Sequence, residues 1–297
     1  RRVLFRSRRH ALPEDDNSER PTRMSTCILL ATFNGEPHLP QLLDSLLAQT
    51  MQDWQLLVRD DGSSDATPEL VRRAARANRR IHIICDARGR LGPAQNFGAL
   101  MGAALVGGFR HVAFADQDDV WIPQKLERQL QRMHRAEDAG GAELPLLVHS
   151  DLTVVDERLA VLHESFMRCS GLPFADRVSL ETLIVRNHVV GCTMLANRPL
   201  LELAVPTPAE MVMHDWWLGL LAVTCGRLRY DDTPLVLYRQ HSNNEVGATN
   251  LEQKLRAGWR DWRTVWDRSL SNFRKGEFQA QALRDRLRQQ RQDSPML

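Results

Sequence analysis

The chain has 297 residues and a formal net charge of +2, with 43% hydrophobic and 26% charged side chains. This length suits one large globular domain with an added segment, and the balanced charge argues against nucleic acid as a partner. No apolar run approaches the roughly 20 residues that cross a bilayer. Five scattered cysteines, none spaced as C-x-x-C, argue against a disulfide framework or a zinc site and favour reduced thiols in the cytoplasm.

Residues 1–23 are polar and show no periodic pattern, whereas the pattern of a folded domain begins directly after Met24. The segment also lacks the apolar core of a secretory signal. Its letters "RVLFRS" resemble a translated sequencing adapter. We therefore expect residues 1–23 to be a disordered leader or an artefact of the open reading frame, whose removal leaves activity unchanged.

From Met24 onward, short apolar runs alternate with segments of helical spacing. Strands are expected at 27–32, from 54 to the acids at 60–61, at 81–85 and at 111–116, and helices at 37–50, from 67 onward, at 93–105 and at 123–138. Strands and helices that alternate in this way form a mainly parallel sheet with helices on both faces. The sequence therefore predicts an α/β fold.

Beyond about residue 150 the pattern becomes mixed, with strands expected at 146–151, 189–196 and 235–239 and a helix at 214–223. From Leu251 to Phe273, apolar side chains recur every three or four residues among Arg and Lys, as in an amphipathic helix: Leu251, Leu255, Trp259, Trp262, Trp266, Leu270 and Phe273. Such a helix suits an anionic membrane surface. The alternative, equally open, is that the same apolar face docks on the catalytic domain.

Two of the first four strands end in acidic clusters, Asp60-Asp61 and Asp116 to Asp119. Ligands of parallel α/β sheets bind outside the carboxyl ends of the strands, so these acids are expected around one crevice. Crowded carboxylates are unfavourable unless a cation neutralises them, and hard oxygen ligands suit Mg²⁺ or Mn²⁺ bound to phosphates. The alternative is a solvated turn with an acidic helix cap, which a bare D-x-D pattern favours. The buried strand before Asp116 favours the metal.

Five motifs in this order resemble those of family 2 glycosyltransferases of GT-A fold: "ATFNGEPHLPQLLDSLLAQT", "VRDDGSSDAT", "FADQDDVWIPQKL", "HDWWL" and "YRQHSNN". The chain is most similar to the bacterial rhamnosyltransferase-like group, which builds surface polysaccharides. The resemblance covers about residues 25–250. It implies a GT-A, Rossmann-like domain over residues 24–250, followed by a C-terminal amphipathic helical segment over residues 251–297.

The resemblance also implies a nucleotide-sugar site. Thr32, Phe33 and Glu36 follow the first strand, where the family holds the nucleotide. Asp61 matches the acid that hydrogen-bonds the pyrimidine base. Asn96 matches a position near the sugar nucleotide, with a helix-surface role as the open alternative.

A divalent cation, Mg²⁺ or Mn²⁺, is implied beside that nucleotide. Asp116 matches the family position near ribose and metal, and Asp118 matches the principal metal ligand, with Asp119 behind them. His241 matches a late histidine that completes the metal or diphosphate site, although a solvated or structural histidine is equally compatible with the sequence.

Asp215 is the expected catalytic base, because the family has its catalytic acid at this point and the carboxylate begins an apolar helix whose dipole stabilises an anion. A simple helix cap is the alternative. Trp216 and Trp217 then line the sugar site or pack in the core. Asn187 and His188 match the acceptor side, where a plain turn is the alternative.

These residues imply an inverting transfer of a hexose, by resemblance L-rhamnose from dTDP-rhamnose, to a saccharide or a polyprenyl-diphosphate-linked saccharide. The enzyme would work in the cytoplasm, with peripheral contact at the inner face of the cytoplasmic membrane. Two other functions stay open. A sugar nucleotidyltransferase is disfavoured because a Gly-rich basic loop does not follow the first strand, and a non-catalytic scaffold is disfavoured because Asp116, Asp118 and Asp215 are intact.

Overall fold

A computed structural model describes residues 26–171, 178–240 and 276–290 of the chain. Three of the predictions concern residues outside these ranges: the leader over residues 1–23, His241, and the apolar stripe from Leu251 to Phe273.

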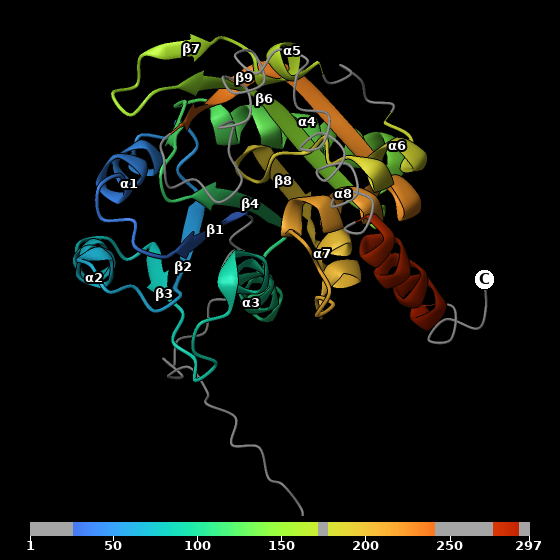
Figure 1. The fold of residues 1–297 in the computed structure, drawn as a ribbon, viewed down its shortest axis with the longest axis horizontal. Coiled ribbons are helices and arrows are strands. Elements are labelled where there is room, and N and C mark those ends of the chain that lie inside the picture. The colour runs from blue at the N-terminus through green and yellow to red at the C-terminus, as the bar shows by residue number, and fades with distance from the viewer. Residues whose placement is uncertain (1–25, 172–177, 241–275, 291–297) are drawn as a thin grey trace, which may run out of the picture.

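Strands and helices alternate through the first half of the described chain, as the sequence predicts (Figure 1). The strands are β1 (Thr26–Thr32), β2 (Trp54–Asp60), β3 (Ile81–Ile83), β4 (His111–Asp116), β5 (Val120–Trp121), β6 (Leu146–Val155), β7 (Val161–His163), β8 (Met194–Asn197) and β9 (Arg227–Arg239). The helices are α1 (Leu39–Leu47), α2 (Thr67–Ala77), α3 (Gly92–Val106), α4 (Lys125–Gly140), α5 (Phe166–Ser170), α6 (Leu180–Val185), α7 (Arg198–Ala204) and α8 (His214–Cys225), with a 3₁₀ turn η1 (Gly191–Thr193) and a last helix over residues 276–290.

The strands form one sheet in the order β3-β2-β1-β4-β8-β6-β9-β5, with β7 paired to β6. The four strands of the first half, β3, β2, β1 and β4, are all parallel to one another. The later strands mix directions, because β8 runs antiparallel to both β4 and β6 whereas β9 runs parallel to β6. The parallel half brings the carboxyl ends of β1, β2 and β4 to one edge.

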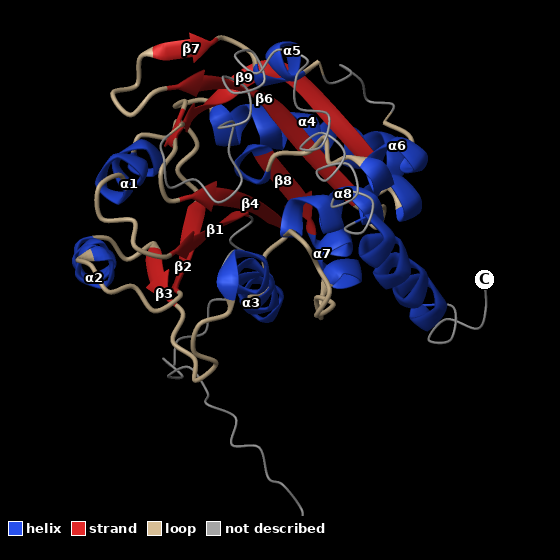
Figure 2. Ribbon diagram, in the orientation of Figure 1, coloured by secondary structure: helices blue, strands red, loops and turns tan. Residues whose placement is uncertain are grey.

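Helices cover both faces of the sheet (Figure 2). Alternate residues of β1 point to opposite faces: Cys27 and Leu29 pack with α3, α7 and α8, whereas Ile28 and Leu30 pack with α1, α2 and α4. The two sides are called here the α3 face and the α1 face. Each face has its own apolar core, so the sheet is buried on both sides, as expected for an α/β fold.

Two predicted strands are shorter than expected, and the first of them, predicted over residues 81–85, ends at Ile83. The sequence predicts a strand over residues 189–196, but only Met194–Asn197 is extended, and residues 191–193 form η1. A Cβ on Gly191 would lie 2.9 Å from Nε2 of His214, so the backbone of η1 passes close to the first turn of α8. This turn brings the 187–193 segment against α8.

The helix over residues 276–290 lies beside α7 and α8 on the α3 face (Figure 1). Leu283 is 4% exposed within that core, and the Arg286 guanidinium donates to the carbonyl oxygens of Leu203 (2.7 Å) and Val205 (3.2 Å). Among the described residues, we find no helix with the length and apolarity needed to span a bilayer.

Candidate active site

The acids of the first half gather at the carboxyl edge of the parallel strands. In the sheet register, Thr32 at the end of β1 lies opposite Asp60 of β2, and Ala31 lies opposite Asp116 of β4. The Thr32 hydroxyl donates to Asp60 at 2.9 Å. Thr32 and Asp60 are 28 positions apart in sequence, and Phe33 and Gln117 are 84 positions apart. Both pairs meet at one edge because parallel strands end together.

Asp116 is surrounded by other acids. Its pKa is raised to about 7, first by burial and then by the negative charges of Asp118 and Asp215. One ligand atom each of Asp116, Asp119 and Cys192 lie within 4.8 Å of one another. This excess of buried negative charge fits a divalent cation, which would offset the repulsion. The sequence predicts Asp116 and Asp118 as metal ligands with Asp119 behind them, whereas Cys192 joins Asp116 and Asp119 only in the folded chain.

Asp119 faces inward. It is fully buried, and its carboxylate accepts the backbone N–H of Arg239 at 3.2 Å. The Arg239 guanidinium donates to the carbonyl oxygen of Asp118 at 2.9 Å and to Gln41 at 2.5 Å. The end of β9 thus fixes the backbone of the acidic loop, and Arg239 is 1% exposed.

Asp215 lies in the first turn of α8, as predicted. Burial raises the pKa of this carboxyl to about 7, opposed by hydrogen bonds from the backbone of Trp216 and Gly191 and from the Asn187 side chain. The N–H of Trp216 donates to its Oδ1 at 2.6 Å. The charge of Asp215 also acts on Asp116, so the two carboxyl groups, 99 positions apart in sequence, lie close enough to interact.

The predicted acceptor-side residues lie next to Asp215. The Asn187 side chain hydrogen-bonds the Asp215 carboxylate and accepts the N–H of Val189 at 3.0 Å. His188 is 3% exposed, and its pKa is lowered by burial and by the charge of Arg186. The structure therefore brings Asn187 to the Asp215 carboxylate.

The two tryptophans after Asp215 belong to the core of the α3 face. Trp217 is fully buried, and its indole N–H donates to the carbonyl oxygen of Ala204 at 3.1 Å. Trp216 is 6% exposed, and its indole N–H donates to Leu183 at 2.6 Å. Both tryptophans therefore pack in the core, which the sequence left open as the alternative to lining the sugar site.

Where the sequence predicts the nucleotide, the loop after β1 is tied to the acidic loop. The backbone N–H of Phe33 donates to Gln117 Oε1 at 2.8 Å, and Gln117 Nε2 donates back to the Phe33 carbonyl oxygen at 2.9 Å. Glu36 is exposed and accepts the N–H of Ala66 at 3.1 Å, just before α2. Phe33 is half-buried, and the guanidinium of Arg90 lies 4.0 Å from its ring centroid.

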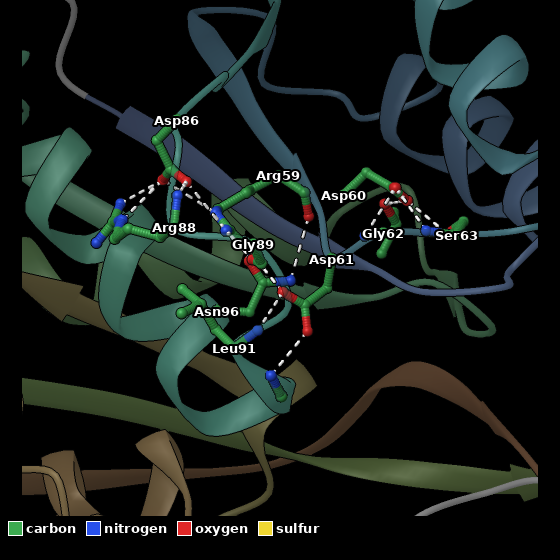
Figure 3. Close-up of polar contacts among 12 residues, drawn as sticks. Arg59, Asp60, Asp61, Gly62, Ser63, Asp86, Arg88, Gly89, Leu91 and Asn96 are labelled. Carbon is green, nitrogen blue, oxygen red and sulfur yellow. Dashed lines mark hydrogen bonds and ion pairs between the residues drawn. The ribbon is translucent and has the colours of Figure 1, made fainter.

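Asp61 and Asn96 meet at a buried arginine (Figure 3). Arg59 Nη1 donates to Asp61 Oδ1 at 2.8 Å and to Asn96 Oδ1 at 3.0 Å, while Asn96 Nδ2 donates to the Arg59 carbonyl oxygen at 3.2 Å. Asn96 is 2% exposed, so it is not a helix-surface residue.

Several residues of this edge were not identified from the sequence. Three of them contact predicted site residues: Arg59, Gln117 and Cys192. The fourth is the buried Lys125, which lies 3.5 Å from the centroid of the Trp121 ring and near the charge of Asp119. For Arg59 a signal existed: a charged residue inside an otherwise apolar strand needs a buried partner. For Cys192 no pattern in the sequence pointed to the acids.

Comparison with known proteins gives a consistent result. A family model described as glycosyl transferase family 2 matches residues 27–142. An uncharacterized glycosyltransferase of Nostoc sp. is 32% identical over 250 residues, covering 79% of this chain and 72% of that protein. The dTDP-rhamnosyl transferase RfbG of Shigella flexneri is 25% identical over 225 residues, covering 74% of each.

Among solved structures, a mannosyltransferase of Pyrobaculum calidifontis, in complex with GDP-Man and Mn²⁺, has a TM-score of 0.55 at 16% identity, covering 88% of this chain and 74% of that one. At this identity the likeness shows a shared fold. The chain spans 59% of the length of three mycobacterial relatives that are 23% identical to it, and 42% of a TarS chain of S. aureus.

Proposed function

The chain belongs to glycosyltransferase family 2, and from that premise we propose that it is a metal-dependent, inverting hexosyltransferase. The proposed donor is dTDP-L-rhamnose, and the proposed acceptor is a saccharide or a polyprenyl-diphosphate-linked saccharide in surface polysaccharide synthesis. The 25% identity to a dTDP-rhamnosyl transferase supports this donor.

The observation on which this proposal depends is the convergence of Asp116, Asp118 and Asp215. The charges of Asp118 and Asp215 both act on the half-buried Asp116 carboxyl. Sugar transfer needs one group of acids to offset charge at the leaving diphosphate and a separate carboxylate to take a proton. Acids from the end of β4 and from the start of α8 supply these two functions side by side.

In the proposed reaction, the Asp215 carboxylate accepts the proton of an acceptor hydroxyl. The hydroxyl oxygen attacks the anomeric carbon while the bond from that carbon to the diphosphate oxygen breaks on the opposite side. This single displacement inverts the anomeric centre, and the nucleoside diphosphate leaves. Asn187 orients the Asp215 carboxylate through their hydrogen bond.

Asp116 and Asp118 would hold the cation, together with His241, which lies outside the described residues. When bound, Mg²⁺ or Mn²⁺ supplies positive charge that stabilises the departing diphosphate. The Mn²⁺ in the fold relative from Pyrobaculum calidifontis supports the choice of metal.

Thr32, Phe33, Glu36, Asp61 and Asn96 form the proposed nucleotide side. Thr32 and Asp61 are buried at the strand ends, so their part is to fix the floor of the site, whereas Phe33 offers an aromatic ring at its rim. Asn187 and His188 are the proposed acceptor side.

We also propose that the enzyme acts in the cytoplasm, at the inner face of the cytoplasmic membrane. All five cysteines are free, which fits a reducing compartment. Association with liposomes containing anionic lipid tests the membrane contact: the full chain should bind them, and replacing Trp259, Trp262 and Trp266 with Ala should weaken binding, whereas unchanged binding would contradict this segment as the contact.

The decisive experiment is a thermal-shift screen of the full chain against dTDP-rhamnose, UDP-GlcNAc and GDP-mannose with Mn²⁺ or Mg²⁺, followed by turnover on lipid-linked saccharides. We expect dTDP-rhamnose to give the largest shift, EDTA to abolish turnover, and added Mn²⁺ to restore it. Full turnover in EDTA would contradict the metal, and a larger shift with another donor would contradict the proposed sugar.

A further inference from the structure

The loop between β3 and α3 lies beside the proposed nucleotide side but has no part in the mechanism described above. Residues 86–92, called here the arginine loop, contain Asp86, Arg88 and Arg90. The loop follows the carboxyl end of β3, which pairs with β2 in the parallel half of the sheet. It therefore leaves the sheet at the same edge as the acids.

The first anchor of the arginine loop is Arg59 (Figure 3). Its Nε and Nη2 donate to the two carboxylate oxygens of Asp86 at 3.1 and 3.0 Å, and Nη2 also donates to the Gly89 carbonyl oxygen at 2.7 Å. The Arg59 side chain is 4% exposed. A planar guanidinium that binds a carboxylate through two parallel hydrogen bonds fixes both position and orientation.

The second anchor is Asp61. Its Oδ1 accepts the N–H of Leu91 at 2.8 Å, and its Oδ2 accepts the N–H of Gly92 at 2.7 Å. Because Arg59 Nη1 donates to the same carboxylate, the two anchors are themselves joined. Gly89 and Gly92 both have positive φ, at 67° and 75°, which lets the loop turn tightly onto these anchors.

Arg90 lies between the two anchored parts of the loop, and its side chain is exposed. Its guanidinium stacks over Phe33, whose backbone is in turn held by Gln117 of the acidic loop. A guanidinium in this position can stack on a flat base and pair with phosphate oxygens. The buried network thus presents one cation at the rim where the nucleotide is proposed to bind.

We propose that Arg90 is a donor-recognition residue that contacts the nucleotide, and that Arg59 is a positioning residue that places it. This inference rests on the proposed function, because the ligand is taken to be a nucleoside diphosphate. It predicts that Arg90 governs donor affinity and leaves proton transfer at Asp215 largely unchanged.

The first test uses Arg90→Ala in the full chain, with binding of dTDP measured by calorimetry in Mn²⁺ and turnover measured over a range of donor concentrations. The Kd for dTDP and the KM for the donor should rise about tenfold, while kcat at saturating donor changes less than about threefold. Arg80→Ala is the matched control, since Arg80 stacks on Trp54 at 3.9 Å at the opposite end of β2, and it should change neither value.

The second test uses Arg59→Lys, which keeps the charge but cannot bind Asp86 through two hydrogen bonds while also reaching Asp61. The donor KM should rise about as much as in Arg90→Ala, with kcat retained and the thermal transition still cooperative. In the double variant, Arg59→Lys with Arg90→Ala, the Kd for dTDP should rise by less than the product of the rises in the two single variants. The reason is that Arg59 acts partly through Arg90. A lower melting temperature with unchanged dTDP affinity would overturn the positioning role.

The outcomes separate this inference from the proposed function. If the wild-type chain binds dTDP, UDP or GDP and Arg90→Ala binds the same nucleotide within twofold of wild type, the recognition role of Arg90 is wrong and the proposed function stands. If the wild-type chain binds none of the three nucleotides in Mn²⁺, both are overturned.

Discussion

At the scale of single residues, the proposed chemistry depends on carboxyl groups whose surroundings disfavour ionisation. Burial raises the pKa of Asp215 to about 7, and burial together with Asp118 and Asp215 raises the pKa of Asp116 to a similar value. A carboxylate with a pKa near neutrality is a stronger base than a solvated one, and it still releases its proton at physiological pH. Both residues were identified from the sequence, but their mutual interaction was not.

Replacing Asp215 with Asn should remove the base and leave the donor site intact. We expect kcat to fall by about 10² to 10⁴, the usual contribution of a general base, with donor affinity within about twofold of wild type. Asp44→Asn, at an exposed position on α1, is the control and should retain full turnover. Near-normal turnover of Asp215→Asn would show that Asp215 only stabilises the start of the helix and does not act as the base.

The pH profile follows from the same carboxyl group. Because Asp215 accepts a proton only when ionised and its pKa is raised to about 7, kcat should increase as pH rises from 6 to 8 and then level off. The measurement is turnover at saturating donor and metal over this range. A profile that is already level at pH 5 would mean that the base has an ordinary pKa.

The raised pKa also predicts a stability change. A carboxyl whose folded pKa lies above its unfolded value of about 3.9 stabilises the fold at low pH, and that contribution is lost as pH rises through about 7. Asp215→Asn should therefore raise the melting temperature by at least about 2 °C at pH 8 and by less at pH 5. Melting curves of the metal-free protein test this, and a larger gain at pH 5 would contradict the sign.

At the scale of elements, the site is assembled where η1 meets the start of α8. The His214 ring stacks on Phe97 with ring centroids 3.8 Å apart, and Gly191 lies against the Nε2 and Cε1 atoms of the same ring. Because a Cβ at Gly191 would come within 3.0 Å of the His214 ring, glycine lets the 187–193 segment reach Asp215. The helix was predictable from its apolar spacing, whereas the turn was not.

Gly191→Ala should disturb this junction. We expect a loss of about 1–3 kcal/mol in the free energy of unfolding and a lower kcat, because Asn187 and Asp215 would move apart. Gly102→Ala is the matched control: it lies in α3 with open space around it and should be neutral or gain about 0.5–1 kcal/mol. Urea unfolding and turnover measure both effects, and equal stability of the two variants would contradict the close approach.

At the scale of the whole molecule, the chain buries its sheet between two apolar cores and closes one of them with its last described helix. Leu283 enters the α3 face, and Arg286 hydrogen-bonds the carbonyl oxygens at the end of α7. Trp216 and Trp217 of α8 belong to the same core. The packing that supports Asp215 therefore extends to residues 276–290.

Leu283→Ala should cost about 2–4 kcal/mol of unfolding free energy, since it leaves a cavity in this core. Phe278→Ala, on the same helix but 56% exposed, should change stability by less than about 0.5 kcal/mol. Chemical denaturation of both variants gives the comparison. An equal loss in the two would mean that the helix does not dock through Leu283.

The sequence by itself determined the α/β alternation, the helix after His214 and the acids at the strand ends. These follow from local patterns, because apolar spacing sets the element and parallel strands share one carboxyl edge. The resemblance to family motifs added the proposed roles of Asp116, Asp118 and Asp215; Asp215→Asn tests the base, and turnover in EDTA tests the metal.

Only the tertiary structure decided which distant groups meet: Asp116 with Asp215 and Cys192, Asn187 with Asp215, and Arg59 with Asp86. No local pattern encodes these contacts, because each depends on how elements far apart in the chain pack across the sheet. Likewise, whether Trp217 lines the sugar site or packs in the core depends on its burial. A sequence gives the apolar character of a residue but not its neighbours in the fold.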